Sequence, residues 1–145
     1  MLDKVVFFQK YKLTDDDLSK ATLKWSELEE IYSDFISKQT ELSLTADFIA
    51  GRLRQVDKVH SLGVRVKDSE HLLQKIIRKM KEDPLRDIKL NNYSSKITDL
   101  IGIRTLHLFK EDWIHIHEAI KKVWDLHEKP TANIREGDPI NNKSF

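Results

Sequence analysis

The run of residues from Ile97 to Leu108 is the most apolar and β-branched stretch of the sequence, and a clear helical pattern follows it. Apolar residues occupy both alternating sets of positions, with Ile101 and Ile103 on one side and Leu106 and Leu108 on the other. Apolar residues on both faces are typical of a strand inside a sheet that helices cover on both sides. We therefore predict a central strand here, around which the other elements are arranged.

The composition limits the class of protein. With 145 residues, 34% charged and 39% hydrophobic, the chain matches one folded domain and not a disordered segment. Its 25 basic and 24 acidic residues nearly cancel, so we expect no specific nucleic-acid partner and no membrane partner, and any basic site must be local. The absence of cysteine excludes disulfides, thiol catalysis and cysteine-based zinc sites. Because no stretch of about 18 apolar residues occurs, we predict a soluble cytoplasmic protein.

Two amphipathic helices are predicted in the first 60 residues. Thr14 and the acids after it match a helix start, and apolar residues recur every three or four positions as far as Lys38. Ser43 or Thr45 is a second capping position, before an apolar stripe that reaches Val59. We predict that these helices pack as a hairpin, so that residues 1–60 form a helical segment ahead of residues 61–145 within one structural domain.

The rest of the chain mixes strand and helix patterns. Period-two alternation over residues 62–67 predicts a strand, and an apolar face over residues 69–81 predicts a helix that stops before Pro84. A further helix is predicted over residues 112–126, with a buried face made of Trp113, Ile116, Ile120, Val123 and Trp124. Residues 132–136 are predicted as a short strand. The mixture predicts an α+β fold.

Basic residues gather where the strand at residues 62–67 meets the helix at residues 69–81. They are Arg65, Lys67, His71, Lys75, Arg78 and Lys79. The spacing of four places the helical cations on the side opposite the apolar stripe, and the free N–H groups of the first helical turn lie near the end of the strand. This arrangement predicts a cradle for a polyphosphate. The alternative is an exposed basic helix face, which is common enough that spacing alone favours it.

Two charged residues interrupt the apolar run from Ile97 to Leu108. Asp99 lies where the chain enters the predicted central strand, and a carboxylate near phosphates is a suitable ligand for Mg²⁺. The alternative is an aspartate that only caps a turn, which taken alone is the commoner case. Arg104 lies within the strand, where it reaches either a phosphate or a carboxylate inside the sheet. The sequence leaves both choices for Arg104 open.

The order of these motifs resembles the first half of the synthetase domain of the RelA/SpoT family. The matching residues are GVRVK at 63–67, Lys75, DLIGIR at 99–104 and KPTANIREGD at 129–138. The resemblance implies a nucleotidyltransferase-like mixed β-sheet flanked by helices. It also implies a GTP pyrophosphokinase of the stringent response, which transfers pyrophosphate from ATP to the 3′-hydroxyl of GDP or GTP and so makes ppGpp or pppGpp.

The resemblance also implies a role for each matching residue. Arg65 is expected against the adenine, Lys67 and Lys75 on the ATP phosphates, and Asp99 on Mg²⁺, so that Arg65, Lys67 and Asp99 are the predicted catalytic residues. The predicted ATP-binding set consists of Arg65, Lys67, His71, Lys75, Arg78, Lys79 and Arg104.

The chain departs from the family pattern in two respects. His71 occupies the position at which the family usually has serine. The sequence also lacks the Gly-Tyr-x-Ser-x-His segment, whose tyrosine stacks on guanine, and the later strand that carries a catalytic glutamate. We therefore expect an inactive, truncated ATP-side fragment that self-associates as a homo-oligomer. The alternative is a non-catalytic module on the same fold that binds a polyanion or a protein.

Overall fold

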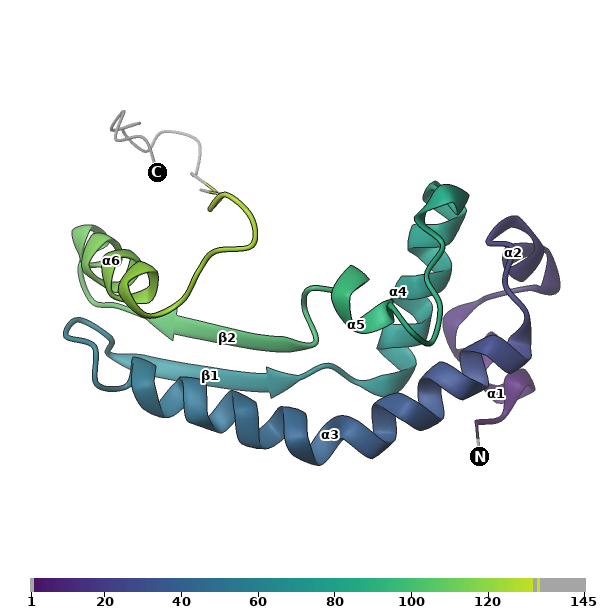
Figure 1. Cartoon of the computed structure of the whole chain (residues 1–145), viewed down its shortest axis with the longest axis horizontal. Helices are drawn as coiled ribbons and strands as arrows, with labels where there is room; N and C mark the ends of the chain where they lie inside the picture. Colours follow the sequence, from purple (N-terminus) through teal and green to yellow (C-terminus); the bar gives the residue numbers. More distant parts are fainter. Residues whose placement is uncertain (1, 132, 134–145) are drawn as a thin grey trace.

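The computed structural model describes residues 2–131 and 133 and has an α+β fold, as predicted. Figure 1 shows a bundle of helices at one end of an elongated molecule and a small sheet at the other. The α-helices are α1 (Lys4–Tyr11), α2 (Asp15–Lys20), α3 (Trp25–Leu53), α4 (Ser69–Glu82), α5 (Tyr93–Lys96) and α6 (Trp113–Val123). The strands are β1 (Ser61–Val66) and β2 (Ile101–Leu106), and short 3₁₀ helices lie at Pro84–Arg86 and Lys110–Asp112.

The predicted N-terminal hairpin is wrong, because α3 is one continuous helix of 29 residues. No glycine or proline lies between residues 38 and 50, so nothing in the local sequence ends the helix there. The predicted helix start at Thr14 is confirmed by a capping box with Asp17, but that helix is the short α2. It ends before Thr22, whose positive φ of 54° interrupts the helical backbone ahead of α3.

The predicted helix over residues 69–81 is confirmed as α4, and it supplies much of the core. Its apolar face, made of Leu72, Leu73, Ile76, Ile77 and Met80, is fully buried. The core partners of α4 come from α1, α3 and the segment around α5, and include Phe7, Leu28, Ile31, Phe35, Tyr93 and Ile97. The hydroxyl of Tyr93 donates a 2.6 Å hydrogen bond to Asp34 on α3, so this buried phenol has a partner.

The predicted strand at residues 62–67 is confirmed as β1, which pairs antiparallel with β2. The prediction of a central strand covered on both faces is wrong for the described residues, where β2 has only β1 as a neighbour. Leu106 and Leu108 are 55% and 68% exposed. Helix α3 packs along β1, so one face of the sheet is covered and the other is open. A mixed sheet, expected from the resemblance, is not present in the described part of the chain.

Helix α6 confirms the helix predicted over residues 112–126, but its predicted burial is largely wrong. Of the described residues in α6, Ile116 is the only one that is buried. Val123 is 48% exposed, while Trp113, Ile120 and Trp124 are intermediate. The short strand predicted at residues 132–136 lies outside the described residues, apart from residue 133. No helix within the described residues is long and apolar enough to span a membrane.

Helix α3 offers a matched test of where the core lies. Leu28 is fully buried, whereas Leu44 on the same helix is 67% exposed. We expect Leu28→Ala to lower the free energy of unfolding by about 2–5 kcal/mol, because it leaves a cavity in the core. Leu44→Ala should change it by less than about 0.5 kcal/mol. Urea denaturation followed by circular dichroism measures both, and similar losses in the two variants would contradict this packing.

Candidate functional site

A cavity of about 740 Å³ lies along the polar face of α4, between this helix, the start of β2 and the turn that joins α1 to α2. Its volume is in the range of small-molecule sites in proteins. The residues that line it are Leu13, Lys67, His71, Gln74, Lys75, Ile77, Arg78, Lys81, Glu82 and Asp99. Most of its charged groups are cations, so the cavity suits an anionic ligand.

The junction between β1 and α4 places the basic side chains of the cavity. The Lys67 N–H donates a 2.8 Å hydrogen bond to the carbonyl of Leu100, which extends the pairing of the strands beyond β1. Asp68 then caps α4 by accepting a 2.9 Å hydrogen bond from the N–H of His71. Because the strand and the helix are joined by so short a connection, Lys67 and Lys75 have little freedom to move apart.

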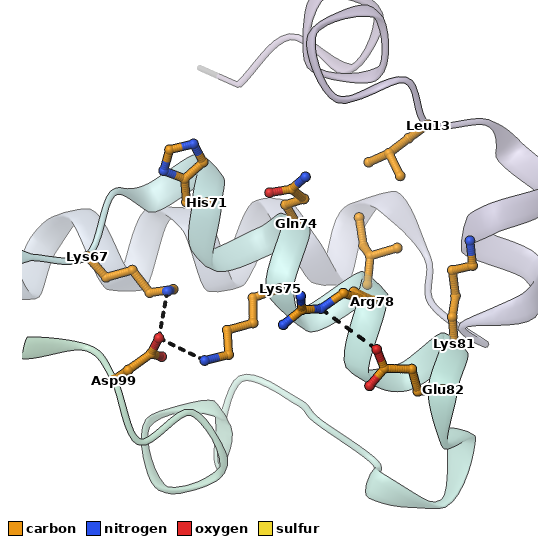
Figure 2. Close-up of a pocket in the computed structure, with 10 residues that line it drawn as sticks. Leu13, Lys67, His71, Gln74, Lys75, Arg78, Lys81, Glu82 and Asp99 are labelled. Carbon is orange, nitrogen blue, oxygen red and sulfur yellow. Dashed lines mark hydrogen bonds and ion pairs between the residues drawn. The ribbon is translucent and has the colours of Figure 1, made fainter. Parts of the chain in front are cut away.

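Both lysines converge on one oxygen of Asp99, as Figure 2 shows. The Oδ2 atom of Asp99 lies 3.0 Å from Nζ of Lys67 and 2.7 Å from Nζ of Lys75. The lysine side chains are 14% and 21% exposed, so these ion pairs are partly shielded from water. The other oxygen of Asp99, Oδ1, is buried and has no hydrogen-bond partner among the described residues.

The pKa of Asp99 reflects opposing effects. Burial raises it, but the ion pairs with Lys75 and Lys67 outweigh burial and hold the pKa at about 2. The carboxylate is therefore ionised at neutral pH and carries a full negative charge between two positive ones. Since the folded pKa lies below its ordinary value, the stability that Asp99 contributes is present above pH ~4 and is lost as the pH falls toward about 2.

The structure brings five of the predicted site residues together in this cavity, namely Lys67, His71, Lys75, Arg78 and Asp99. Lys79 does not line it. Around the helix axis Lys79 lies about 40° from Lys75 on the side away from Arg78, at the edge of the face that lines the cavity.

Arg65 and Arg104 lie on the open face of the sheet, beside a second hollow of about 350 Å³. In the strand register, Arg65 pairs with Gly102 and Arg104 pairs with Gly63, so all four residues share one face. The Arg65 side chain covers Gly102, with its Nε only 3.1 Å from where a β-carbon would lie. Nothing lies within 4 Å of the corresponding point at Gly63. The floor of this hollow therefore has two glycines, of which Gly102 is covered by Arg65 and Gly63 is open.

The sequence analysis did not predict that the N-terminal helices α1 and α2 contact α4 beside the cavity. Glu70 accepts hydrogen bonds from Lys10 at 2.5 Å and from the Tyr11 hydroxyl at 3.2 Å. The Tyr11 ring also packs edge-on against His71, with the ring centroids 5.8 Å apart. At the other end of α4, Lys81 pairs with Asp17, which holds α2 against this helix.

Four residues that line the cavity were not predicted, namely Leu13, Gln74, Lys81 and Glu82, beside the core residue Ile77. Helical spacing could have found Gln74, Lys81 and Glu82, which lie three or four residues from His71 or Arg78 on the same face. No sequence signal identifies Leu13, because its place in the site results from packing between segments far apart in the chain.

The described residues include no group of three or more metal-ligating side chains that could hold an ion without help. Mg²⁺, however, is commonly bound by one or two carboxylates together with substrate phosphates and water. Asp99 suits that type of site, since its Oδ1 is buried and lacks a partner among the described residues. A metal at this position therefore fits the residues present, provided that a phosphate ligand supplies further oxygens.

Fold and site together define an α+β protein with a basic cavity at a strand-to-helix junction. The family model described as "Region found in RelA / SpoT proteins" matches residues 64–144, which is more than half of the chain. The chain belongs to this family, and the resemblance noted in its motifs is confirmed. No curated protein and no solved structure matches the chain significantly. Membership of the family points to a nucleotide pyrophosphotransferase class of function.

The ionisation of Asp99 tests the geometry of the two ion pairs. In a carbon-detected NMR titration, we expect the Asp99 carboxyl group to titrate with a midpoint near pH 2 and to be ionised at pH 3. Lys75→Met removes one ion pair without shortening the side chain greatly, so the midpoint should rise. A wild-type midpoint near pH 4, or no change in the variant, would show that the lysines do not hold this carboxylate.

Proposed function

We propose that this chain carries the ATP-binding side of a RelA/SpoT-type pyrophosphokinase. In this reaction the 3′-oxygen of GDP or GTP attacks the β-phosphorus of ATP, the bond from that phosphorus to the α,β-bridging oxygen breaks, and AMP leaves. The observation that carries the proposal is the convergence of Lys67 and Lys75 on Asp99, in a chain that belongs to this family. The nucleotide substrates are consistent with a cytoplasmic protein.

The direction of β1 suggests how ATP lies in the site. Residues two apart on a strand face the same side and are about 6.6 Å apart, so Gly63, Arg65 and Lys67 form a row on the open face. We assign the adenine to the glycine floor between Arg65 and Arg104, where a guanidinium group can stack on the base. The phosphates then extend past the end of β1 to Lys67, Lys75 and Arg78.

The chemistry proposed for these residues is positioning and charge stabilisation. Lys67 and Lys75 hold the β- and γ-phosphates and offset the negative charge that builds on the transferred group. Asp99 is the residue that would hold Mg²⁺, which supplies further neutralisation of the phosphate oxygens when bound. His71 faces the same cavity and would contact a phosphate oxygen in place of the usual serine.

A second candidate function is a module that binds polyanions without catalysis. It is favoured by the cavity itself, in which the cations Lys67, Lys75, Arg78 and Lys81 outnumber the other charged groups. Inorganic tripolyphosphate separates the two functions, because it carries the phosphates of ATP without the nucleoside. An ATP site should bind ATP more tightly than tripolyphosphate, whereas a general polyanion site should not.

Calorimetric titration of the chain with ATP in excess magnesium tests the phosphate contacts. We expect Lys75→Ala to weaken ATP binding by roughly 10-fold or more, because a charge-assisted contact with phosphate is lost. Lys79→Ala is the matched control, since it removes the same charge from the same helix outside the cavity, and it should change the affinity less than about 3-fold. Equal effects in the two variants would refute this assignment of the phosphate site.

The adenine position can be tested with Arg65→Ala. We expect this variant to bind ATP roughly 5-fold or more weakly, through loss of stacking on the base. Tripolyphosphate binding should change much less, because no base is present. Arg54→Ala removes the same charge beyond the opposite end of β1 and serves as the control. A parallel loss of ATP and tripolyphosphate binding in Arg65→Ala would place this arginine on the phosphates instead.

A further inference from the structure

We propose that Asp99 makes this site select the magnesium complex of a nucleotide over the free nucleotide, by occupying both phosphate-binding lysines until a metal ion takes over its carboxylate. The inference rests on the proposed function, since it takes Lys67 and Lys75 as the phosphate contacts. It adds a specificity role to Asp99 that goes beyond ligating the metal.

The geometry makes Asp99 a competitor of phosphate. A single oxygen, Oδ2, receives both lysines at 3.0 and 2.7 Å, and Asp99 is the one acid with which either lysine pairs among the described residues. The cradle therefore contains two positive charges with one negative charge between them. A phosphate that approaches either Nζ atom also approaches this carboxylate, and the two anions repel each other.

Removing the lysines from Asp99 without replacing them would be costly. Oδ1 is buried and has no hydrogen-bond partner in the described structure, so the ion pairs at Oδ2 are what stabilise this carboxylate. If a metal-free phosphate drew both lysines away, the Asp99 side chain, which is 41% exposed, would keep only water as a donor to Oδ2. The loss of both ion pairs is unfavourable, because Oδ1 would stay buried and unpaired while Oδ2 exchanged two cations for water. Free nucleotide must therefore bind against this cost, or bind beside an intact ion pair.

A divalent cation removes the conflict. The cation takes the place of the two lysines beside Asp99 when these lysines turn to the phosphates. The carboxylate can accept the cation, because its Oδ1 has no other partner among the described residues. Metal and phosphate then each favour the binding of the other, and the coupling between them passes through Asp99. Without Asp99, the metal would only reduce the negative charge of ATP and so reduce its attraction to the lysines.

With Asp99 present, magnesium should raise the affinity for ATP, and without Asp99 it should lower that affinity. In calorimetric titrations with ATP, the wild-type chain should bind more tightly in excess magnesium than in EDTA. Asp99→Asn keeps the shape of the side chain and removes its charge, so its affinity in EDTA should rise by roughly 3- to 10-fold over wild type. In this variant, magnesium should weaken binding. Asp57 precedes β1, whereas Lys67 follows it; Asp57→Asn makes the same change in net charge and should behave as wild type.

The outcomes separate this inference from the function on which it rests. Folded wild-type chain that binds ATP in neither condition would overturn both. Wild-type binding that depends on Lys75, together with unchanged or weaker binding by folded Asp99→Asn in EDTA, would overturn only the role of Asp99. If Asp99→Asn does not fold, the wild-type chain decides with tripolyphosphate alone: affinity that falls when magnesium is added would overturn the inference, and affinity that rises would support it.

Discussion

The candidate site depends on one carboxylate that is shared by two lysines from different elements. Lys67 follows β1, Lys75 projects from α4, and Asp99 precedes β2, so the ion pairs join all three elements at one point. Ion pairs on an open surface contribute little to stability. These lysines are largely shielded, and they suppress the protonation of Asp99. The result is a strong local field in a protein whose net charge is only +1.

The fold maintains this arrangement of charges by packing the apolar side of α4, opposite the cavity, into the core. The leucine and isoleucine face of this helix is fully buried, and the Asp68 cap fixes where the helix begins. The polar face is thereby held in one orientation relative to β1. This core does not include α6, in which Ile116 is the only buried residue among those the structure describes. The molecule is thus most firmly packed at the end where the cations converge.

Local sequence predicted the elements that carry the site but not their contacts. The period of α4 and the alternation of β1 were clear in the sequence, because both depend on neighbours a few residues apart. The bond between Lys75 and Asp99 requires the pairing of β1 with β2, which no local pattern reveals. The central-strand prediction was wrong for a related reason. The apolar residues from Ile97 to Leu108 show that this stretch can be buried, but they do not show that helices cover both of its faces. The hairpin was wrong because a capping residue such as Ser43 does not by itself end a helix.

The N-terminal helices contact the candidate site, although the family match does not include them. That match begins at residue 64, yet Leu13 lines the cavity and Tyr11 packs against His71. Tyr11 also shares Glu70 with Lys10, so α1 is tied to the first turn of α4, next to the basic residues that line the cavity. A change in α1 would therefore act on His71 directly, through an aromatic contact, and on Lys75 through the position of the helix. The functional unit thus extends beyond the matched region and includes the helices before it.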